Sequence, residues 1–215
     1  MKKIVEGVLR FKEEVYPQHL GLFKELSSGQ SPEVLMITCA DSRVDPGMIT
    51  QAYPGELFIC RNAGNIVPPH SNHTGGMTAS IEYAVGVLKV SEIVVCGHTD
   101  CGAMKGVMNL EPLKESLPHV CNWLSHSKAA VHVAREKTSE DDNTEFLKSV
   151  TEQNVLLQLQ HLKTHPLVAA GIAAGRIRLH GWIYDIEHGE ILAYDEKEDA
   201  FAPLAETLKA DAAAA

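Results

Sequence analysis

Two short segments of the sequence carry residue types that bind soft metal ions. Residues 38–43 contain Cys39, and residues 96–102 contain His98 and Cys101. Two thiolates and one imidazole form a soft ligand set that suits Zn²⁺, and three protein ligands leave the fourth tetrahedral position open. The sequence therefore predicts a catalytic zinc site with one metal ion per chain.

An acidic and a basic residue follow the first of these cysteines. Asp41 lies two residues after Cys39, and Arg43 lies two residues after Asp41. We expect Arg43 to keep the Asp41 carboxylate ionised, so that this carboxylate accepts a hydrogen bond from the zinc-bound water. A second interpretation makes Asp41 the fourth zinc ligand, which would close the site. In a third, the two residues form an exposed salt bridge with no catalytic role.

Each metal-ligand segment follows a short apolar run that is typical of a buried strand. Val34–Ile37 precedes the first segment, and Ile93–Val95 precedes the second. Buried strands that alternate with helices predict a single-domain α/β fold, with a mainly parallel central sheet flanked by helices. Sites in such sheets lie at the carboxyl ends of the strands, where Cys39 and His98 fall.

The remaining pattern predicts how the chain is divided. We expect an N-terminal helical arm at 1–28, a zinc-binding catalytic domain at 29–205 and a disordered tail at 206–215. An antiparallel edge strand at 191–194 should pair with a strand at 177–183. Further elements are a strand at 57–60, a short helix at 46–51, and helices at 77–88, 102–109, 118–135 and 144–163.

Composition restricts the partners and the compartment. The net charge of −9 argues against nucleic acid or an anionic membrane as a partner, and no apolar run approaches the ~20 residues of a membrane span. An N-terminus without a signal-like apolar stretch favours the cytoplasm. The five cysteines are an odd number, which favours metal binding over disulfides. Cys60 and Cys96 fit the core, and Cys121 stays open. Surface or capping roles are expected for nine further histidines: His70, His73, His119, His126, His132, His161, His165, His180 and His188.

Five motifs, taken together and in order, make the chain similar to a known enzyme family. Residues 39–43, 61–65, 82–85, 97–103 and 180–185 resemble the β-class carbonic anhydrases, most of all the bacterial cyanate-operon and cyanobacterial members. The resemblance spans about residues 4–195. It implies a zinc lyase, a carbonate dehydratase, that hydrates CO₂ reversibly to bicarbonate and a proton by attack of zinc-bound hydroxide oriented by an Asp–Arg dyad. It also implies a homodimer as the minimal unit, assembled as a dimer of dimers or homotetramer.

The same resemblance implies a role for each site residue. It makes Cys39, His98 and Cys101 the zinc ligands and makes Asp41 with Arg43 the dyad. Substrate would be bound by four further residues, some of them supplied by the neighbouring subunit: Gln30, Phe58, Tyr83 and the backbone N–H of Gly102.

Two positions depart from family patterns. Members with a non-catalytic bicarbonate site carry a tryptophan where this chain has Met36, although Arg61 and Tyr184 match the rest of that site. We therefore expect the open, water-bound form of the zinc site, with little bicarbonate-driven ligation by Asp41. Plant relatives carry a histidine, proposed as a proton carrier, where this chain has Val87, so the proton route is not assigned.

Two other functions fit parts of the pattern. A hydrolase of CS₂ or COS uses the same scaffold and zinc ligands, and access to the site would distinguish it. A catalytically silent zinc protein that serves as a binding partner would retain the ligands, but the intact Asp41, Arg43 and Gln30 argue against it.

Overall fold

The structure of the chain is a computed structural model that describes residues 1–72 and 75–207. These residues belong to two compact units, one at Met1–Ser31 and the other beginning at Pro32. His73 and residues 208–215, most of the expected tail, lie outside the described residues.

The N-terminal unit is helical almost throughout. Pro17 lies in the first turn of a 3₁₀ segment, where a missing N–H breaks no hydrogen bond. No residue of its helical segments is buried, although the rings of Phe11, Tyr16 and Phe23 contact one another. The segments are α1 (Lys2–Arg10), a π-helical turn (Phe11–Val15), the 3₁₀ segment (Tyr16–His19) and α2 (Leu20–Leu26).

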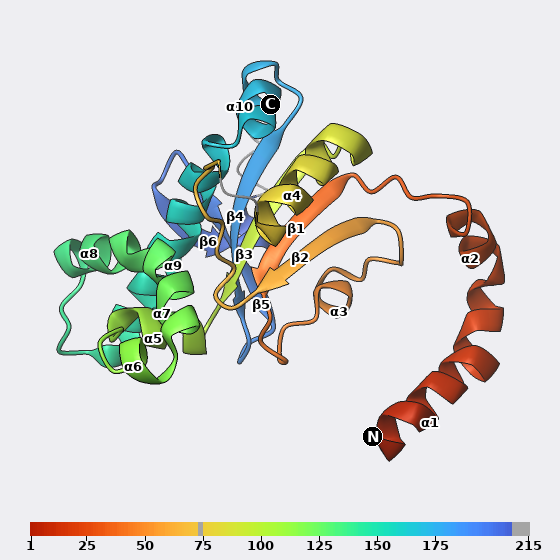
Figure 1. The fold of residues 1–215 in the computed structure, drawn as a ribbon, viewed down its shortest axis with the longest axis horizontal. Helices are drawn as coiled ribbons and strands as arrows, with labels where there is room; N and C mark the ends of the chain where they lie inside the picture. Colours follow the sequence, from red (N-terminus) through yellow and green to blue (C-terminus); the bar gives the residue numbers. More distant parts are fainter. Residues whose placement is uncertain (73–74, 208–215) are drawn as a thin grey trace. The chain divides into compact units, whose positions relative to one another are not determined.

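The second unit is built on one sheet of six strands (Figure 1). The strand order is β2-β1-β3-β4-β5-β6; the pairs from β2 to β4 are parallel, and the pairs from β4 to β6 are antiparallel. The mainly parallel sheet and the antiparallel pairing of residues 191–194 with the strand at 178–185 are therefore confirmed, but residues 191–194 lie inside the sheet, because β6 forms its antiparallel edge. Its strands are β1 (Val34–Cys39), β2 (Leu57–Asn62), β3 (Glu92–His98), β4 (Arg178–Asp185), β5 (Glu190–Asp195) and β6 (Ala200–Pro203).

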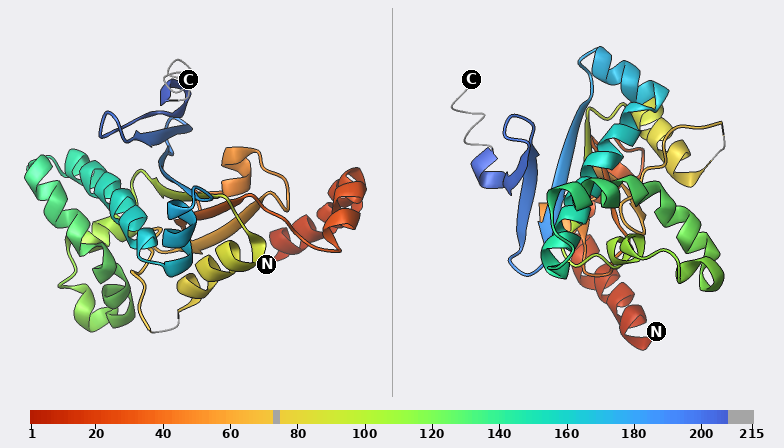
Figure 2. Two further views of the ribbon diagram at one scale, coloured as in Figure 1. Left: turned by 90° about the horizontal axis from the view of Figure 1, so that it is seen from above. Right: turned by 90° about the vertical axis from the view of Figure 1, so that its left-hand side faces the viewer.

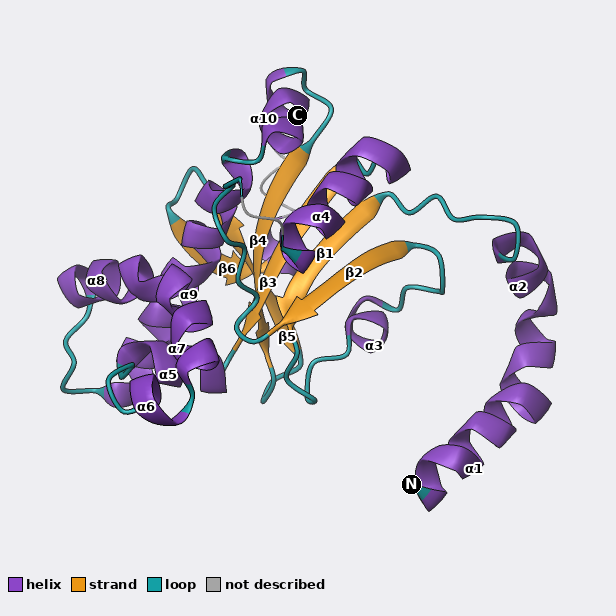
Figure 3. Ribbon diagram, viewed as in Figure 1, coloured by secondary structure: helices purple, strands orange, loops and turns teal. Residues whose placement is uncertain are grey.

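Helices cover one face of this sheet and one end of it. Helices α4, α9 and α10 lie against one face (Figure 2), where Ile81, Leu159 and Val168 pack on strand residues. The helices α5 to α8 gather beside one end of the sheet around a second apolar cluster (Figure 3). The helices are α3 (Pro46–Thr50), α4 (Gly76–Tyr83), α5 (Gly102–Met108), α6 (Leu113–Ser116), α7 (Pro118–Leu124), α8 (Lys128–Lys137), α9 (Asn143–Lys163) and α10 (Pro166–Ala173).

The central strand β1 shows why the apolar runs are continuous. Leu35 and Ile37 pack in the cluster beneath the helices, whereas Met36 packs with Trp182 and Tyr184 in a separate cluster. Because successive side chains of a strand point to opposite faces, a stretch that is buried on both faces is apolar at successive positions.

Several elements differ from the sequence prediction. The expected helix at 118–135 is two helices, because a 3₁₀ turn at Ser125–Ser127 separates α7 from α8. A π-helical turn at Ala84–Leu88 ends the expected 77–88 helix. The short elements α6, α10 and β6 were not predicted, since none is long enough to establish a periodic pattern.

Candidate metal centre

The predicted metal ligands come together at the carboxyl ends of two neighbouring strands. Cys39 ends β1 and His98 ends β3, and the parallel register that pairs Thr38 with Cys96 brings both ends to one edge of the sheet. Cys101 caps α5 three residues later. The ligand atoms of these three buried residues lie within 4.8 Å of one another, as a single metal ion requires.

The imidazole of His98 is held in one tautomer. Its Nδ1 lies 2.9 Å from the carbonyl oxygen of Thr99, and because a carbonyl can only accept, Nδ1 carries the proton. Nε2 therefore presents its lone pair, and it is fully buried without a hydrogen-bond partner among the described residues. An unpartnered lone pair beside two thiols is what a metal ligand requires, so the site fits Zn²⁺.

The two thiols shift each other's pKa in opposite directions. A hydrogen bond from Cys101 lowers the pKa of Cys39 to about 4, although burial opposes this shift. The same bond, together with burial and the negative charge of Cys39, raises the pKa of Cys101. Cys39 also accepts a hydrogen bond of 3.3 Å from the backbone N–H of Gly64. A cation between the sulfurs favours the thiolate form of both cysteines.

Asp41 and Arg43 lie directly beside this group. Arg43 donates from Nε and Nη2 to the two oxygens of Asp41, over 3.0 and 2.9 Å. These hydrogen bonds hold the pKa of Asp41 well below its usual range. The Asp41 Oδ2 atom lies 3.8 Å from His98 Nε2, so an ionised carboxylate borders the ligand group.

The turn after β1 has two supports that the sequence analysis did not identify. Asp100 accepts from Arg43 Nη1 at 3.0 Å, and its own backbone is left-handed, with φ of 58°. Arg61 donates to the carbonyl oxygens of Cys39 and Asp41 at 2.9 and 2.7 Å. The position of Asp100 between two predicted ligands was a signal that could have identified it.

The expected substrate-binding residues are not all near this group. Gly102 begins α5 directly after Cys101 and is exposed. Phe58 pairs with Leu35, four residues before Cys39, which is about 13 Å back along the strand. The Tyr83 ring lies 5.9 Å from that of Phe58. Gln30 is an exposed residue of the N-terminal unit.

The other cysteines and histidines have separate surroundings. All five cysteines are buried and free, and Cys60, Cys96 and Cys121 pack in apolar clusters. Among the described residues, only the Cys39 group has metal-ligand geometry. His161 and His165 instead contact the carbonyl oxygens of Val67 and Pro68.

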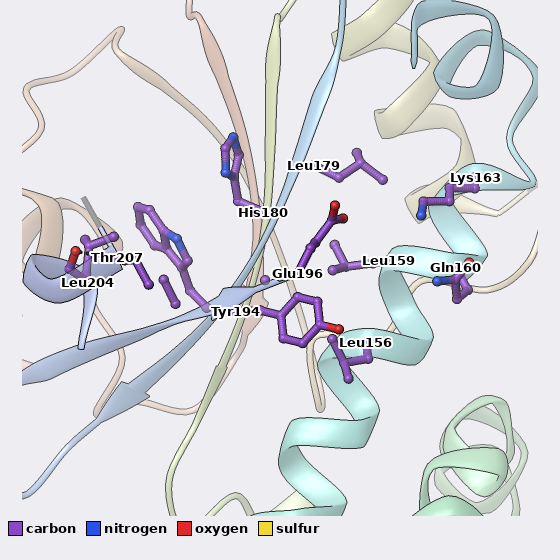
Figure 4. Close-up of a pocket in the computed structure, with 13 residues that line it drawn as sticks. Leu156, Leu159, Gln160, Lys163, Leu179, His180, Tyr194, Glu196, Leu204 and Thr207 are labelled. Carbon is purple, nitrogen blue, oxygen red and sulfur yellow. Dashed lines mark hydrogen bonds between the residues drawn. The ribbon is translucent and has the colours of Figure 1, made fainter. Parts of the chain in front are cut away.

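A cavity of about 530 Å³ lies away from the metal ligands. Figure 4 shows it between α9, β4 and β5, with Leu156, His180 and Tyr194 among its lining residues. None of the lining residues belongs to the metal group or to the Asp41–Arg43 pair. This cavity is therefore not part of the candidate metal centre.

Comparison with known proteins decides the family. A family model described as carbonic anhydrase matches residues 34–191. A carbonic anhydrase of Pseudomonas aeruginosa is 49% identical, covering 96% of this chain and 93% of the relative, and carbonic anhydrase 1 of Escherichia coli is 45% identical, covering 95% and 93%. The solved structure of the β-carbonic anhydrase CcaA superimposes with a TM-score of 0.92 at 43% identity, over 94% of this chain and 98% of that one. The chain belongs to the β-class carbonic anhydrases.

This membership confirms the predicted activity and cofactor. As a β-carbonic anhydrase, the chain is a zinc-dependent lyase that converts CO₂ and water reversibly to bicarbonate and a proton. Zinc is the metal that the Cys–His–Cys group accommodates. Among the described residues, no helix is both long and apolar enough to cross a membrane.

Proposed function

We propose that CO₂ hydration in this carbonic anhydrase depends on three residues that bind the metal and on one ion pair that orients the attacking oxygen. Cys39, His98 and Cys101 hold the zinc ion, which lowers the pKa of water so that a nucleophile forms near neutral pH. Asp41 accepts a hydrogen bond from the attacking oxygen and so directs the lone pair of that oxygen at CO₂. Arg43 keeps Asp41 ionised and fixes its orientation.

The observation that carries this proposal is the two-bond contact between Arg43 and Asp41. A carboxylate held by a bidentate guanidinium is both charged and fixed in its plane. Because Arg43 engages both oxygens of Asp41, we propose the open form of the site, in which Asp41 is not the fourth ligand. The buried Met36, at the position of the tryptophan of bicarbonate-regulated members, is consistent with this form.

We further propose that the substrate pocket is completed by a second copy of the chain. Phe58 pairs with Leu35, four residues before Cys39 of its own chain. The Tyr83 ring contacts that of Phe58, and Tyr83 is 44% exposed. These rings would line the pocket of the partner's metal site. Gln30 and the Gly102 N–H would bind substrate oxygens, and a Cβ at Gly102 would meet no neighbouring atom within 4 Å, so space for a ligand exists there.

A homodimer follows as the smallest active unit. A related solved structure, at 30% identity and a TM-score of 0.78 over 89% of this chain and 95% of that one, is described as a tetrameric β-carbonic anhydrase of Sordaria macrospora. A dimer of dimers is therefore our proposal for this chain, and five free thiols favour the cytoplasm.

Stopped-flow CO₂ hydration with a pH indicator, on protein of known zinc content, tests the proposal. We expect a rate that scales with zinc occupancy and rises between pH 6.5 and 9. Full zinc occupancy without hydration would contradict the proposal, and assays with CS₂ and COS would then identify the alternative hydrolase.

A further inference from the structure

The loop after β2 brings one backbone N–H to a metal ligand. Gly64 donates to the Cys39 sulfur at 3.3 Å. Its φ of +83° favours glycine, and a Cβ there would come within 2.9 Å of Met104 Cε and 3.0 Å of Ala103 Cβ. Met104 and Ala103 therefore leave no room for a side chain at residue 64, and glycine lets the backbone N–H approach the Cys39 sulfur.

The peptide that carries this N–H is held from its other side. The carbonyl of the Ala63–Gly64 peptide accepts a hydrogen bond of 2.9 Å from the indole Nε1 of Trp123. One planar peptide group thus connects the indole to the Cys39 sulfur. Hydrogen bonds in such a chain polarise one another, so donation to the carbonyl strengthens the N–H as a donor to sulfur.

A second support acts on the next peptide. Asn154 of α9 donates to the Gly64 carbonyl from Nδ2 at 3.1 Å, and its Oδ1 accepts from Gln158 Nε2 at 2.8 Å. Gln158 in turn accepts from the backbone N–H of Val67 at 2.8 Å. This last bond assigns the amide orientation of Gln158, which then assigns that of Asn154. Both side chains are fully buried, where a misplaced amide would be costly.

We propose that Trp123 and Asn154 are positioning residues that tune the zinc site through Gly64. The proposal rests on the proposed role of Cys39 as a zinc ligand. An N–H donor withdraws electron density from a thiolate, so the metal keeps more of its positive charge and is the stronger Lewis acid. Trp123 and Asn154 act on Cys39 indirectly, because they bind the carbonyl oxygens of Ala63 and Gly64 and not the sulfur. They lie 60 and 90 residues along the sequence from these loop partners.

The substitution Trp123→Phe tests this, because it removes the indole donor and keeps an aromatic ring. The measurements are the pH profile of CO₂ hydration by the zinc enzyme and the thiolate-to-metal charge-transfer band of the cobalt(II)-substituted protein. Without the donor, Cys39 becomes more electron-rich. We therefore expect the hydration profile to move to higher pH and the band to move to longer wavelength. Asn154→Ala, which loosens the next peptide, should shift both in the same direction.

His165→Leu is the matched control. It removes a buried contact to the same loop, at Pro68, four residues beyond Gly64. We expect this variant to lose stability but keep the band and the pH profile of the parent. If both Trp123→Phe and Asn154→Ala retain the parent band and profile, or if His165→Leu shifts them equally, the positioning role is wrong. A parent protein that shows no thiolate–cobalt band would instead overturn Cys39 as a ligand, and with it the proposed function.

Discussion

Arg43 holds Asp41 through two parallel hydrogen bonds, from Nε to Oδ1 at 3.0 Å and from Nη2 to Oδ2 at 2.9 Å. The backbone N–H of Arg43 adds a third bond of 3.0 Å to Oδ1. Asp100 binds the same guanidinium through Nη1, so Arg43 is itself fixed between two carboxylates. An Asp41 carboxylate held this firmly can orient another group by hydrogen bonding. Loss of the Asp41 carboxylate should therefore affect catalysis more than metal binding.

We therefore predict that Asp41→Ala keeps zinc and loses most of the activity. The orienting hydrogen bond disappears, and a group of this kind typically contributes about 10²–10⁴-fold to the rate. Metal analysis and stopped-flow hydration on the same sample measure both effects. Asp45→Asn is the control, because Asp45 lies in the same loop but caps α3 through Met48 N, and asparagine caps equally well. Hydration by Asp41→Ala at the parent rate would rule out the orienting role.

Removal of zinc should destabilise the protein. His98 Nε2 has no other partner among the described residues, and without a cation the negative charge of a Cys39 thiolate raises the pKa of the neighbouring Cys101 thiol. A ligand that binds only the folded state raises its stability by mass action, so a chelator should lower the melting temperature and added Zn²⁺ should restore it. His98→Ala should lose the metal, and its melting temperature should not respond to the chelator. If it responds as the parent does, zinc binds elsewhere.

The sequence predicted the metal group because its signals are local. A strand buried on both faces has a continuous apolar run, and Cys39 and His98 are the last residues of two such strands. The contacts of Trp123 and Asn154 with the loop at Gly64 were not predictable, since they join segments 60 and 90 residues apart. The strand β6 was missed because Ala200–Pro203 is short and lies at the sheet edge, where little apolar pattern is needed.

The metal site that the aromatic pocket residues serve could not be predicted from the sequence either. The motif around Tyr83 could be recognised from residue types, but register decides which metal site it can reach. Phe58 pairs with Leu35 and not with Cys39, and this pairing depends on how β1 and β2 align. One residue of shift would also exchange the faces of the strand, so the apolar pattern of both strands determines the alignment.

The stability of the protein should fall as the pH drops below about 6.5. Burial lowers the pKa of both His161 and His165, which contact carbonyl oxygens of the loop at Val67 and Pro68. The unfolded chain, with an ordinary histidine pKa near ~6.5, then binds more protons than the folded chain. This stability is complete above that pH and is lost as the pH falls towards the lowered pKa values.

Urea unfolding at pH 7.5 and pH 5 measures this loss, and the double substitution of His161 and His165 by Gln should reduce it. His188 acts in the opposite direction, because Asp185 raises its pKa. Its side chain is 68% exposed, so this contribution is small. The same decrease in stability in the double variant would assign the acid sensitivity to other groups.

Mixing two inactive variants tests whether the rings serve the partner's site. Asp41→Ala disables the metal half of its own site, and Phe58→Ala, if our proposal is correct, disables the pocket wall of the partner's site. In a mixed dimer, one site then carries both defects and the other carries neither. Random exchange places half of the chains in mixed dimers, so the mixture should recover about a quarter of the parent activity.

The result depends on which site contains Phe58. If the ring lined the site of its own chain, every site in the mixture would carry one defect, and no activity would return. A mixture of Asp41→Ala with His98→Ala provides the control, because both changes disable the metal half of their own chain whatever the partner contributes. If activity returns in the mixture of Asp41→Ala with Phe58→Ala but not in the control mixture, the ring pair of Phe58 and Tyr83 lines the partner's site. If neither mixture is active, the ring pair lines the site of its own chain.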